Sequence, residues 1–142
     1  MELVELHSLS ASQVADLLQL MQELNPALQV TGAMLFAVAE SDSAHLFAAV
    51  APDGHIVGTA TLCLFVSPTG TKGKIEDVVV SSACRGQGLG RRLMEFALDF
   101  ARKHHAPLEL ALTSNPSRVA ANRLYQELGF RPYQTNVYKL EL

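Results

Sequence analysis

Polar and apolar residues follow a helical period in the first third of the chain. Between Val14 and Met21 the apolar side chains recur every three or four residues, which is the spacing of one helix face. Ser10 and Gln13 form a capping-box pattern in front of this stretch, and Asn25-Pro26 is a helix stop signal. The pattern predicts an amphipathic helix, and residues 1–7 before it predict an opening strand.

The next third has a less decisive pattern. Residues 31–40 are apolar on every side, so periodicity does not separate a buried helix from a buried strand, and we interpret them as a second helix. Residues 45–51 and 55–66 are apolar runs around Pro52-Asp53-Gly54, which predicts a turn and hence an antiparallel hairpin. Residues 67–73 contain Pro and two Gly and predict a flexible loop.

The last part of the chain alternates strand and helix patterns. Ile75–Val80 predicts a strand, a helix follows from Gly88 or Leu89 to His105, and residues 108–113 predict another strand. Asn115-Pro116 predicts the start of a helix that runs to Leu128, and Phe130–Leu142 reads as a final strand. The strand–helix–strand unit requires a parallel pair.

These elements predict one domain over residues 1–142 in the order β-α-α-β-β-β-α-β-α-β. The fold class is α/β (α+β), with a mixed, mostly antiparallel sheet and a central parallel pair. A chain of 142 residues is long enough to bury a core without disulfides or metal.

Composition and charge narrow the classes of function. The net charge is −3, which argues against a general nucleic-acid binder because affinity for phosphate backbones needs surplus Lys and Arg. The five histidines lack metal-ligand spacing, and we expect no metal site. No signal peptide or membrane span is visible, so we expect a cytoplasmic protein. Cys63 fits a buried small side chain, whereas Cys84 beside Arg85 is a conceivable reactive thiol.

A glycine-rich turn joins the Ile75 strand to the next helix. Its sequence is Arg85-Gly-Gln-Gly-Leu-Gly90, and glycines before a helix N-terminus form a site for a phosphate or pyrophosphate. The Rossmann G-x-G-x-x-G pattern fails because Arg91 stands at the third position, and no Walker Gly-Lys-Ser/Thr follows. Taken alone, the turn is also compatible with a tight connection that binds nothing.

Two motifs together resemble the GNAT superfamily of acyl-CoA-dependent N-acetyltransferases. The first is Arg85-x-x-Gly88-x-Gly90 after an apolar strand, and the second is Leu124-Tyr125-x-x-Leu128-Gly129-Phe130. The element order matches that family along the whole chain, and Ile75–Val80 resembles the strand of its glucosamine-6-phosphate N-acetyltransferase branch. The resemblance implies acetyl-CoA as co-substrate and no metal.

The resemblance also implies which residues bind acetyl-CoA. The glycine-rich turn would hold the pyrophosphate through backbone amides, and the backbone of the preceding strand would present the thioester carbonyl. Asn122 is the candidate contact to pantetheine, because the family's Asn seven residues before the Tyr is replaced here by Arg118. The candidate binding residues are Val78, Val79, Val80, Arg85, Gly86, Gln87, Gly88, Leu89, Gly90, Arg91 and Asn122.

The candidate catalytic residues are Tyr125, Glu76 and Asp77. The resemblance implies that Tyr125 hydrogen-bonds the leaving thiolate, although its position also fits the core face of a helix. Side chains alternate along a strand, so Ile75, Asp77 and Val79 should share one face and only one carboxylate should reach the acceptor unless the strand bulges. Glu76 is favoured as base, with Asp77 as the alternative; either acid could also simply stay solvated.

The expected reaction is transfer of an acetyl group from acetyl-CoA to the primary amine of a small molecule or peptide, by direct attack in a ternary complex. The alternative is a domain that binds acyl-CoA as a sensor or regulatory module without turnover. The resemblance is also compatible with a homodimer formed through the C-terminal strand or the sheet edges, and neither a nucleic-acid nor a membrane partner is expected.

Overall fold

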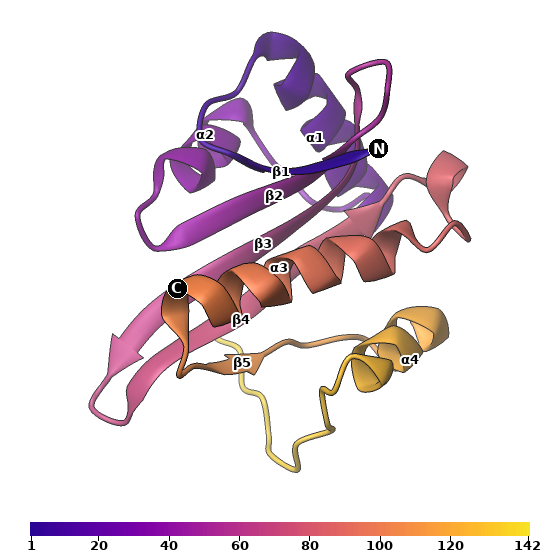
Figure 1. Ribbon diagram of the computed structural model, residues 1–142. Coiled ribbons are helices and arrows are strands. Elements are labelled where there is room, and N and C mark those ends of the chain that lie inside the picture. Colours follow the sequence, from indigo (N-terminus) through magenta and orange to yellow (C-terminus); the bar gives the residue numbers. More distant parts are fainter.

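The computed structural model describes residues 1–142 as one α+β domain (Figure 1). A single sheet carries helices on both faces, and the elements follow the predicted order up to the last helix. They are β1 (Glu2–Leu6), α1 (Ala11–Leu24), α2 (Gly32–Glu40), β2 (Ala44–Val50), β3 (Ile56–Ser67), β4 (Gly70–Val80), the 3-10 turn η1 (Ser82–Cys84), α3 (Leu89–His105), β5 (Glu109–Ala111) and α4 (Val119–Glu127).

The sheet has the strand order β1-β2-β3-β4-β5. The first four strands are antiparallel neighbours, and β5 joins β4 in parallel, as predicted. The prediction that this pair is central is wrong: it lies at the edge of the sheet, because no strand pairs with the outer side of β5. It is also short, since only Lys72–Lys74 of β4 are paired with β5. From Ile75 to Val80, β4 therefore has no neighbouring strand on that side.

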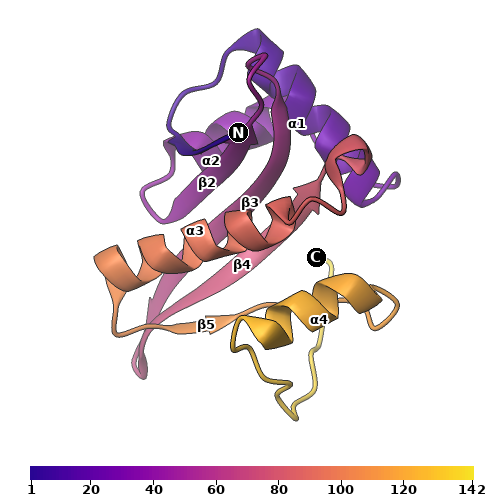
Figure 2. The ribbon, with the colours of Figure 1, turned by 45° about the vertical axis from the view of Figure 1, so that its right-hand side comes forward.

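The helices divide the core into two parts. α1 and α2 cover one face of the sheet and α3 crosses the other (Figure 2). Neighbouring residues of β2 serve opposite faces, with Leu46 packed under α1 and α2 and Phe47 under α3. In α3, Leu93, Ala97 and Ala101 recur every four residues and are almost fully buried, which is the stripe of an amphipathic helix.

Both N-terminal helices begin at a residue whose side chain caps the helix. Ser10 Oγ accepts from the Gln13 backbone N–H at 3.2 Å while the Gln13 side chain accepts from the Ser10 N–H at 2.9 Å, so the predicted capping box is confirmed. The ambiguous apolar stretch forms a helix, as interpreted, and Thr31 caps it by accepting from the Met34 N–H. The N-cap hydrogen bond of Thr31 favours a helix for this stretch, which the apolar periodicity did not distinguish from a strand.

Three predicted boundaries are wrong. Residues 67–73 are not a flexible loop, because β3 continues to Ser67 and β4 begins at Gly70, so only a tight turn remains. The predicted strand over 108–113 is reduced to Glu109–Ala111. α4 begins at Val119, because the Asn115 side chain accepts from the Ser117 N–H at 2.9 Å and stabilises a separate turn first.

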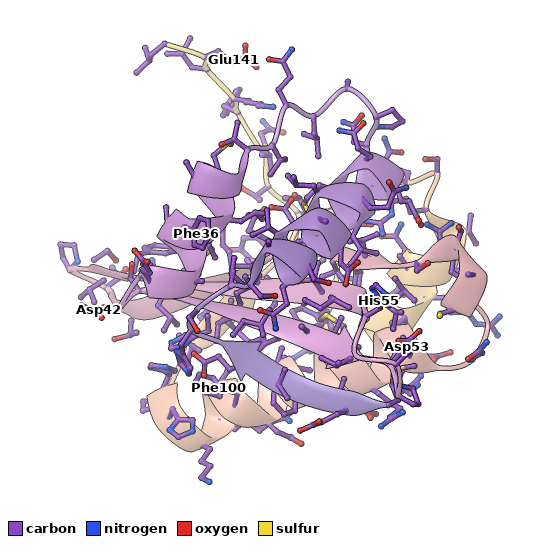
Figure 3. All side chains as sticks on the ribbon, turned by 90° about the horizontal axis from the view of Figure 1, so that it is seen from above. Phe36, Asp42, Asp53, His55, Phe100 and Glu141 are labelled. Atoms are coloured by element: carbon purple, nitrogen blue, oxygen red, sulfur yellow. The ribbon has the colours of Figure 1, made fainter.

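The predicted final strand is also absent. Residues 131–142 have no regular secondary structure and all are exposed. No hydrogen bond joins this segment to the rest of the chain; its one internal bond runs from Asn136 Nδ2 to the Tyr138 hydroxyl. The segment projects away from the body of the molecule, with Glu141 near its tip (Figure 3). A strand needs a partner strand to satisfy its backbone, and within one chain this segment has none.

Candidate active site

A β-bulge in β4 decides where its two acidic residues lie. Thr61 of β3 faces Glu76 and Thr59 faces Val79, so two residues of β4, Asp77 and Val78, oppose one residue of β3. Asp77 takes the extra place with a φ of 52°, a left-handed conformation that Asp adopts more readily than most residues. The alternation that was predicted from Ile75 to Val79 is therefore broken.

The bulge brings both acidic residues to one cavity. Glu76 and Asp77 line a cavity of about 160 Å³ where β4 and β5 diverge. The predicted sharing of one face by Ile75, Asp77 and Val79 is wrong, because Ile75 belongs to the core under α3 and Val79 to the core under α1 and α2. The complete lining is Leu24, Ile75, Glu76, Asp77, Val78, Leu112, Thr113, Arg118 and Tyr125.

Neither carboxylate of the cavity is neutralised within the chain. No ion pair and no hydrogen bond involves the side chain of Glu76 or Asp77. Their charges instead act on Cys63: burial raises the pKa of the Cys63 thiol, and the charges of Glu76 and Asp77 raise it further. Cys63 therefore stays a thiol at neutral pH, which is the unreactive form.

Tyr125 closes the cavity from α4. Its side chain is only 6% exposed, and its ring meets Phe130 edge to face at 6.3 Å between centroids. Burial raises the pKa of the Tyr125 hydroxyl, while the charge of Arg118 and a hydrogen bond from it act in the opposite direction. The phenol is thus protonated at neutral pH, and it lies beside the only cation in the cavity.

The glycine-rich turn leads into the N-terminus of α3. Gly86 and Gly88 have φ values of 79° and 74°, where a side chain is strained, although a Cβ at either position would meet nothing within 4 Å. Gly88 is the N-cap of α3 and offers no side chain, and the first turn holds no acidic residue. The backbone N–H groups at this end of α3 are therefore not capped by the protein, and the helix dipole makes the end attractive to anions.

The two arginines predicted for the phosphates have partners within the protein. Arg85 Nε donates to the Val80 carbonyl at 3.1 Å, and its guanidinium lies 3.9 Å from Glu23 Oε2. Arg91 forms ion pairs with Glu127 of α4 and, at 3.7 Å, with Glu95. Arg85 stays more than half exposed, so it remains available to a ligand, whereas Arg91 ties α3 to α4.

The Asn122 side chain stabilises the turn that precedes α4. Its side-chain amide donates to the Asn115 carbonyl at 2.9 Å and to the Arg118 carbonyl at 2.8 Å. Both hydrogen atoms of the amide thus hold the turn that precedes α4. Arg118 itself was named only as a departure from the family motif, and the structure brings it into the cavity with Glu76, Asp77 and Tyr125.

A larger cavity of about 760 Å³ lies along α4, from Val119 to Glu127. Its single carboxylate, Glu127, already pairs with Arg91 and Arg123. Ser114 is among its lining residues, and Ser114 Oγ is buried without a hydrogen-bond partner. This cavity contains none of the predicted catalytic residues, so the smaller cavity is the candidate active site.

No group of three or more His, Cys, Asp or Glu side chains is arranged to hold a metal ion. None of the helices combines the length and the apolar composition that crossing a membrane requires.

Comparison with known proteins identifies the family. Residues 14–130 match the Acetyltransferase (GNAT) family. The chain is 31% identical over 140 residues to glucosamine 6-phosphate N-acetyltransferase of Trypanosoma brucei brucei, covering 92% of this chain and 91% of that one. It is 35% identical over 97 residues to streptothricin acetyltransferase of Streptomyces lavendulae; this match covers 66% of the chain but only 48% of the Streptomyces protein.

A solved structure has the same fold along the whole chain. A putative acetyltransferase from Agrobacterium tumefaciens superposes with a TM-score of 0.83 at 26% identity, covering 99% of this chain and 100% of that one. The divergence of β4 from β5, the uncapped start of α3 and the tyrosine of α4 thus occur in a chain that belongs to the GNAT family of acetyltransferases.

Proposed function

We propose that the protein transfers the acetyl group of acetyl-CoA to a primary amine, and that the amine attacks the thioester directly while both substrates are bound. The observation that carries this proposal is the unpaired edge of β4 from Ile75 to Val80. That edge borders a cavity that holds two unpaired carboxylates and a buried tyrosine. Such a site offers a binding edge, a base and a hydrogen-bond donor together.

The free edge of β4 suits the pantetheine arm and the thioester. Val78, Val79 and Val80 provide backbone N–H and C=O groups with which an extended amide chain can pair as an added strand would. One of these N–H groups is positioned to stabilise the oxyanion that forms when an amine attacks the carbonyl. The valine side chains do not obstruct this role, since the groups that act belong to the backbone.

The N-terminus of α3 suits the pyrophosphate. The positive φ values of Gly86 and Gly88 turn the backbone so that the first amides of α3 remain free. Gly90 stands close behind, where a Cβ would contact Val80 and Leu124 at 3.8 Å. The end of β4 and the start of α3 are therefore adjacent, as one continuous CoA molecule requires. Arg85 adds an exposed guanidinium at the same end.

The small cavity has room for the reacting groups alone. Its volume of about 160 Å³ corresponds to roughly five water molecules, which is enough for an acetyl thioester and an amine but not for a nucleotide. The rest of the acceptor would extend from the cavity toward solvent.

Glu76 and Asp77 are the candidate bases. A primary amine is protonated at neutral pH, with a pKa of about 10, and must lose a proton before it attacks. A carboxylate that has no partner within the protein can hold the ammonium group and accept its proton, directly or through a water molecule. Because both acids line the cavity, we propose that one binds the ammonium and the other removes the proton, with Glu76 as the first choice for base.

Tyr125 completes the proton balance. The amine nitrogen forms a bond to the carbonyl carbon and then loses its second proton to a carboxylate of the cavity or to water, while the C–S bond breaks and CoA leaves as a thiolate. A thiol has a pKa of about 8.5 and a phenol about 10, so a hydrogen bond from Tyr125 suffices and full proton transfer is optional. The burial that raises the Tyr125 pKa keeps this donor protonated over the working pH range.

Direct attack agrees with the state of the nearest thiol. Cys63 is the cysteine affected by the carboxylates of the cavity, and its pKa is raised, so it does not supply a thiolate nucleophile at neutral pH. Cys84 lies in η1, before the glycine-rich turn. A Cys84→Ala variant should therefore keep full turnover, and its inactivation would indicate an acetyl-enzyme intermediate instead.

A screen of candidate amines identifies the acceptor substrate. One relative carries streptothricin in its name and another glucosamine 6-phosphate, and both compounds, with further amino sugars, polyamines and peptides, belong in a screen. The measurement is release of free CoA thiol from acetyl-CoA with each amine. We expect release with at least one amine at a rate that exceeds hydrolysis without amine.

Binding of CoA is measured in parallel by thermal shift, because a ligand of the folded state raises the melting temperature. Stabilisation by CoA without thiol release for any amine would favour an acyl-CoA sensor over an enzyme. The absence of any shift with CoA or acetyl-CoA would contradict both functions.

A further inference from the structure

The carbonyl of Val80 faces the free edge of β4. Val80 lies opposite Gly58 of β3. The next pair along the ladder is bonded, because the Ser81 N–H donates to the Val57 carbonyl at 2.8 Å. Hydrogen-bonded and non-hydrogen-bonded pairs alternate along antiparallel strands. The N–H and C=O of Val80 therefore point away from β3, to the side on which β4 is no longer paired with β5.

The side chain of Arg85 binds this carbonyl. Arg85 Nε donates to the Val80 oxygen at 3.1 Å, which places a guanidinium on the strand edge. The pantetheine arm is proposed to pair with the same edge, where its amide groups would bond to Val80 as those of an added strand do. Both approach Val80 from the same side of β4. Arg85 and the pantetheine arm therefore compete for one backbone acceptor.

Glu23 of α1 also holds the guanidinium. Its Oε2 lies 3.9 Å from Arg85 Nη2 and accepts from the Ser82 N–H at 2.8 Å. The end of α1 is thus joined to η1 (Figure 2), directly before the glycine-rich turn. The Glu23 side chain is only 21% exposed, against 58% for Arg85. The acid is therefore fixed by the fold, whereas the arginine has room to change its partner.

A phosphate is a stronger partner for Arg85 than the carbonyl is. Hydrogen bonds from a guanidinium to a phosphate have charges on both sides and are frequently bidentate, whereas the acceptor at Val80 is neutral. The pyrophosphate proposed for the start of α3 would lie next to Arg85, because Gly86 and Gly88 follow it in the chain. A ligand that carries this phosphate can draw Arg85 away and free the carbonyl for its own pantetheine arm.

We propose that Arg85 is a specificity-determining residue for the thioester donor: it covers the Val80 carbonyl until a phosphate binds it, so the site accepts CoA thioesters and discriminates against pantetheine thioesters without phosphate. A phosphate-free donor has to break the bond between Arg85 and Val80 and gives the guanidinium no new partner. Glu23 is a positioning residue that keeps the guanidinium at the edge. This inference rests on the proposed function, since it concerns the donor of that reaction.

This role differs from a simple phosphate contact. An arginine that only attracts phosphate strengthens the binding of CoA and leaves a phosphate-free donor unaffected. An arginine that also covers the strand edge weakens the binding of the phosphate-free donor. Removing Arg85 should therefore change the affinities of the two donors in opposite directions.

The first test compares two donors with one variant. NMR titration measures the binding of acetyl-CoA and of S-acetylpantetheine, which has no phosphate, to the wild type and to Arg85→Ala. The variant should bind acetyl-CoA about tenfold more weakly, because a charge-assisted bond is lost, and S-acetylpantetheine about threefold more tightly, because no bond to Val80 has to be broken. S-acetyl-4′-phosphopantetheine should change in the same direction as acetyl-CoA.

Arg102→Ala is the matched control. Arg102 is exposed and pairs with Asp99 at 3.0 Å, and it lies in the last turn of α3, at the far end of that helix from the glycine-rich turn. The variant removes the same charge and should leave the affinities of both donors unchanged. Equal or weaker binding of S-acetylpantetheine to Arg85→Ala, compared with the wild type, would overturn the proposal.

Glu23→Gln tests the contribution of α1. Glutamine keeps an oxygen that can accept from the Ser82 N–H, but it loses the charge that attracts Arg85. S-acetylpantetheine should bind about twofold more tightly to this variant, as expected for the loss of a partly exposed ion pair. The substitution should add nothing in an Arg85→Ala background. An equal gain in both backgrounds would contradict the positioning role of Glu23.

The contact is also measured on the wild type, without a variant that could misfold. Before any ligand is added, the bond to Val80 should slow the exchange of the Arg85 Nε–H with water, which ¹H–¹⁵N NMR detects. Acetyl-CoA should keep this group protected by phosphate at a new chemical shift, whereas saturating S-acetylpantetheine should expose it to fast exchange. Fast exchange before ligand addition would overturn the proposal.

The same titrations distinguish this inference from the proposed function. If acetyl-CoA binds and an amine releases its thiol, but Arg85→Ala weakens both donors alike, Arg85 is only a phosphate contact and the proposed function stands. If acetyl-CoA does not bind to the wild type, the proposed function is contradicted, and the donor specificity of Arg85 with it. Opposite changes for the two donors are the result that supports the inference.

Discussion

Glu76 and Asp77 are consecutive residues of one strand, and yet both line the same cavity. Regular alternation would send their side chains to opposite faces of the sheet. The bulge between the Thr59 and Thr61 pairings breaks this alternation by adding one residue to β4. The bulge thereby gives one small site two carboxylates, at the point where β4 loses its neighbour β5.

The two carboxylates should have separable effects. We expect Glu76→Gln to lower kcat/KM about 10²-fold at neutral pH if Glu76 removes the proton, and to leave the affinity for CoA unchanged. Asp77→Asn should mainly raise KM for the amine. pH–rate profiles with each variant are the measurement, and a larger loss of kcat in Asp77→Asn than in Glu76→Gln would exchange the two roles.

The backbone of the bulge makes a prediction about stability. Asp77 has a φ of 52°, where β-branched residues are strongly disfavoured. Asp77→Val should therefore lower the free energy of unfolding by about 1–2 kcal/mol more than Asp77→Asn does. Urea denaturation measures both. Equal stability of the two variants would mean that residue 77 does not have this conformation in solution.

The glycine-rich turn can be tested with a matched pair of glycines. Gly88 and Gly54 both have positive φ, 74° and 88°, and a Cβ would meet no atom within 4 Å at either position. Replacing either by Ala should cost about 1 kcal/mol of stability through backbone strain alone. Only Gly88→Ala should also weaken CoA binding, because it disturbs the start of α3.

Calorimetric titration with CoA compares these two variants. Equal CoA affinity in Gly88→Ala and Gly54→Ala would contradict the assignment of the pyrophosphate to this turn.

His55 gives a pH-dependent contribution to stability. A hydrogen bond to Asp16 and the charge of Asp16, with a smaller effect of Asp53, raise the pKa of His55. The protonated form is therefore favoured in the folded state, so its stabilisation is fully present below about pH 6.5, the unfolded value, and is lost as the pH rises through the raised folded value.

The variant His55→Gln should accordingly lower the melting temperature more at about pH 5.5 than at about pH 9. A loss of melting temperature that does not depend on pH would indicate that the Asp16 pair does not stabilise the fold through the charge of His55.

Local signals predicted much of the fold. Ser10 with Gln13, the turn at Pro52-Asp53-Gly54 and the apolar stripe of α3 each depend on neighbours within a few residues, and the structure confirms the elements that they predict. The strand predicted over residues 130–142 is absent, because a strand depends on a partner that is distant in sequence. Its alternation is present, but a strand also needs a partner edge, and no local pattern reports whether one exists within the chain.

The sequence indicated three residues of the candidate cavity but not the geometry that brings them together. Motifs indicated Tyr125, Glu76 and Asp77, and all three line one cavity. The bulge that brings the acids together is a mismatch between β3 and β4, and neither strand alone reveals it. Arg118 could be singled out only as a residue that replaces the family's Asn, because no local pattern shows that it lines the same cavity as Tyr125.

Tyr125→Phe tests most directly whether the cavity between β4 and β5 performs the transfer. The substitution keeps the ring that packs on Phe130 and removes only the hydroxyl. Tyr133→Phe is the matched control, because Tyr133 is 87% exposed and is not part of the cavity lining.

The measurement is kcat from CoA thiol release together with Kd for acetyl-CoA from calorimetry, for the wild type and both variants. We expect Tyr125→Phe to lower kcat about 10²-fold with Kd changed less than about threefold, as expected for a group that donates to the leaving thiolate. Tyr133→Phe should match the wild type. Wild-type kcat in Tyr125→Phe, or a parallel loss of kcat and acetyl-CoA affinity, would contradict transfer in this cavity.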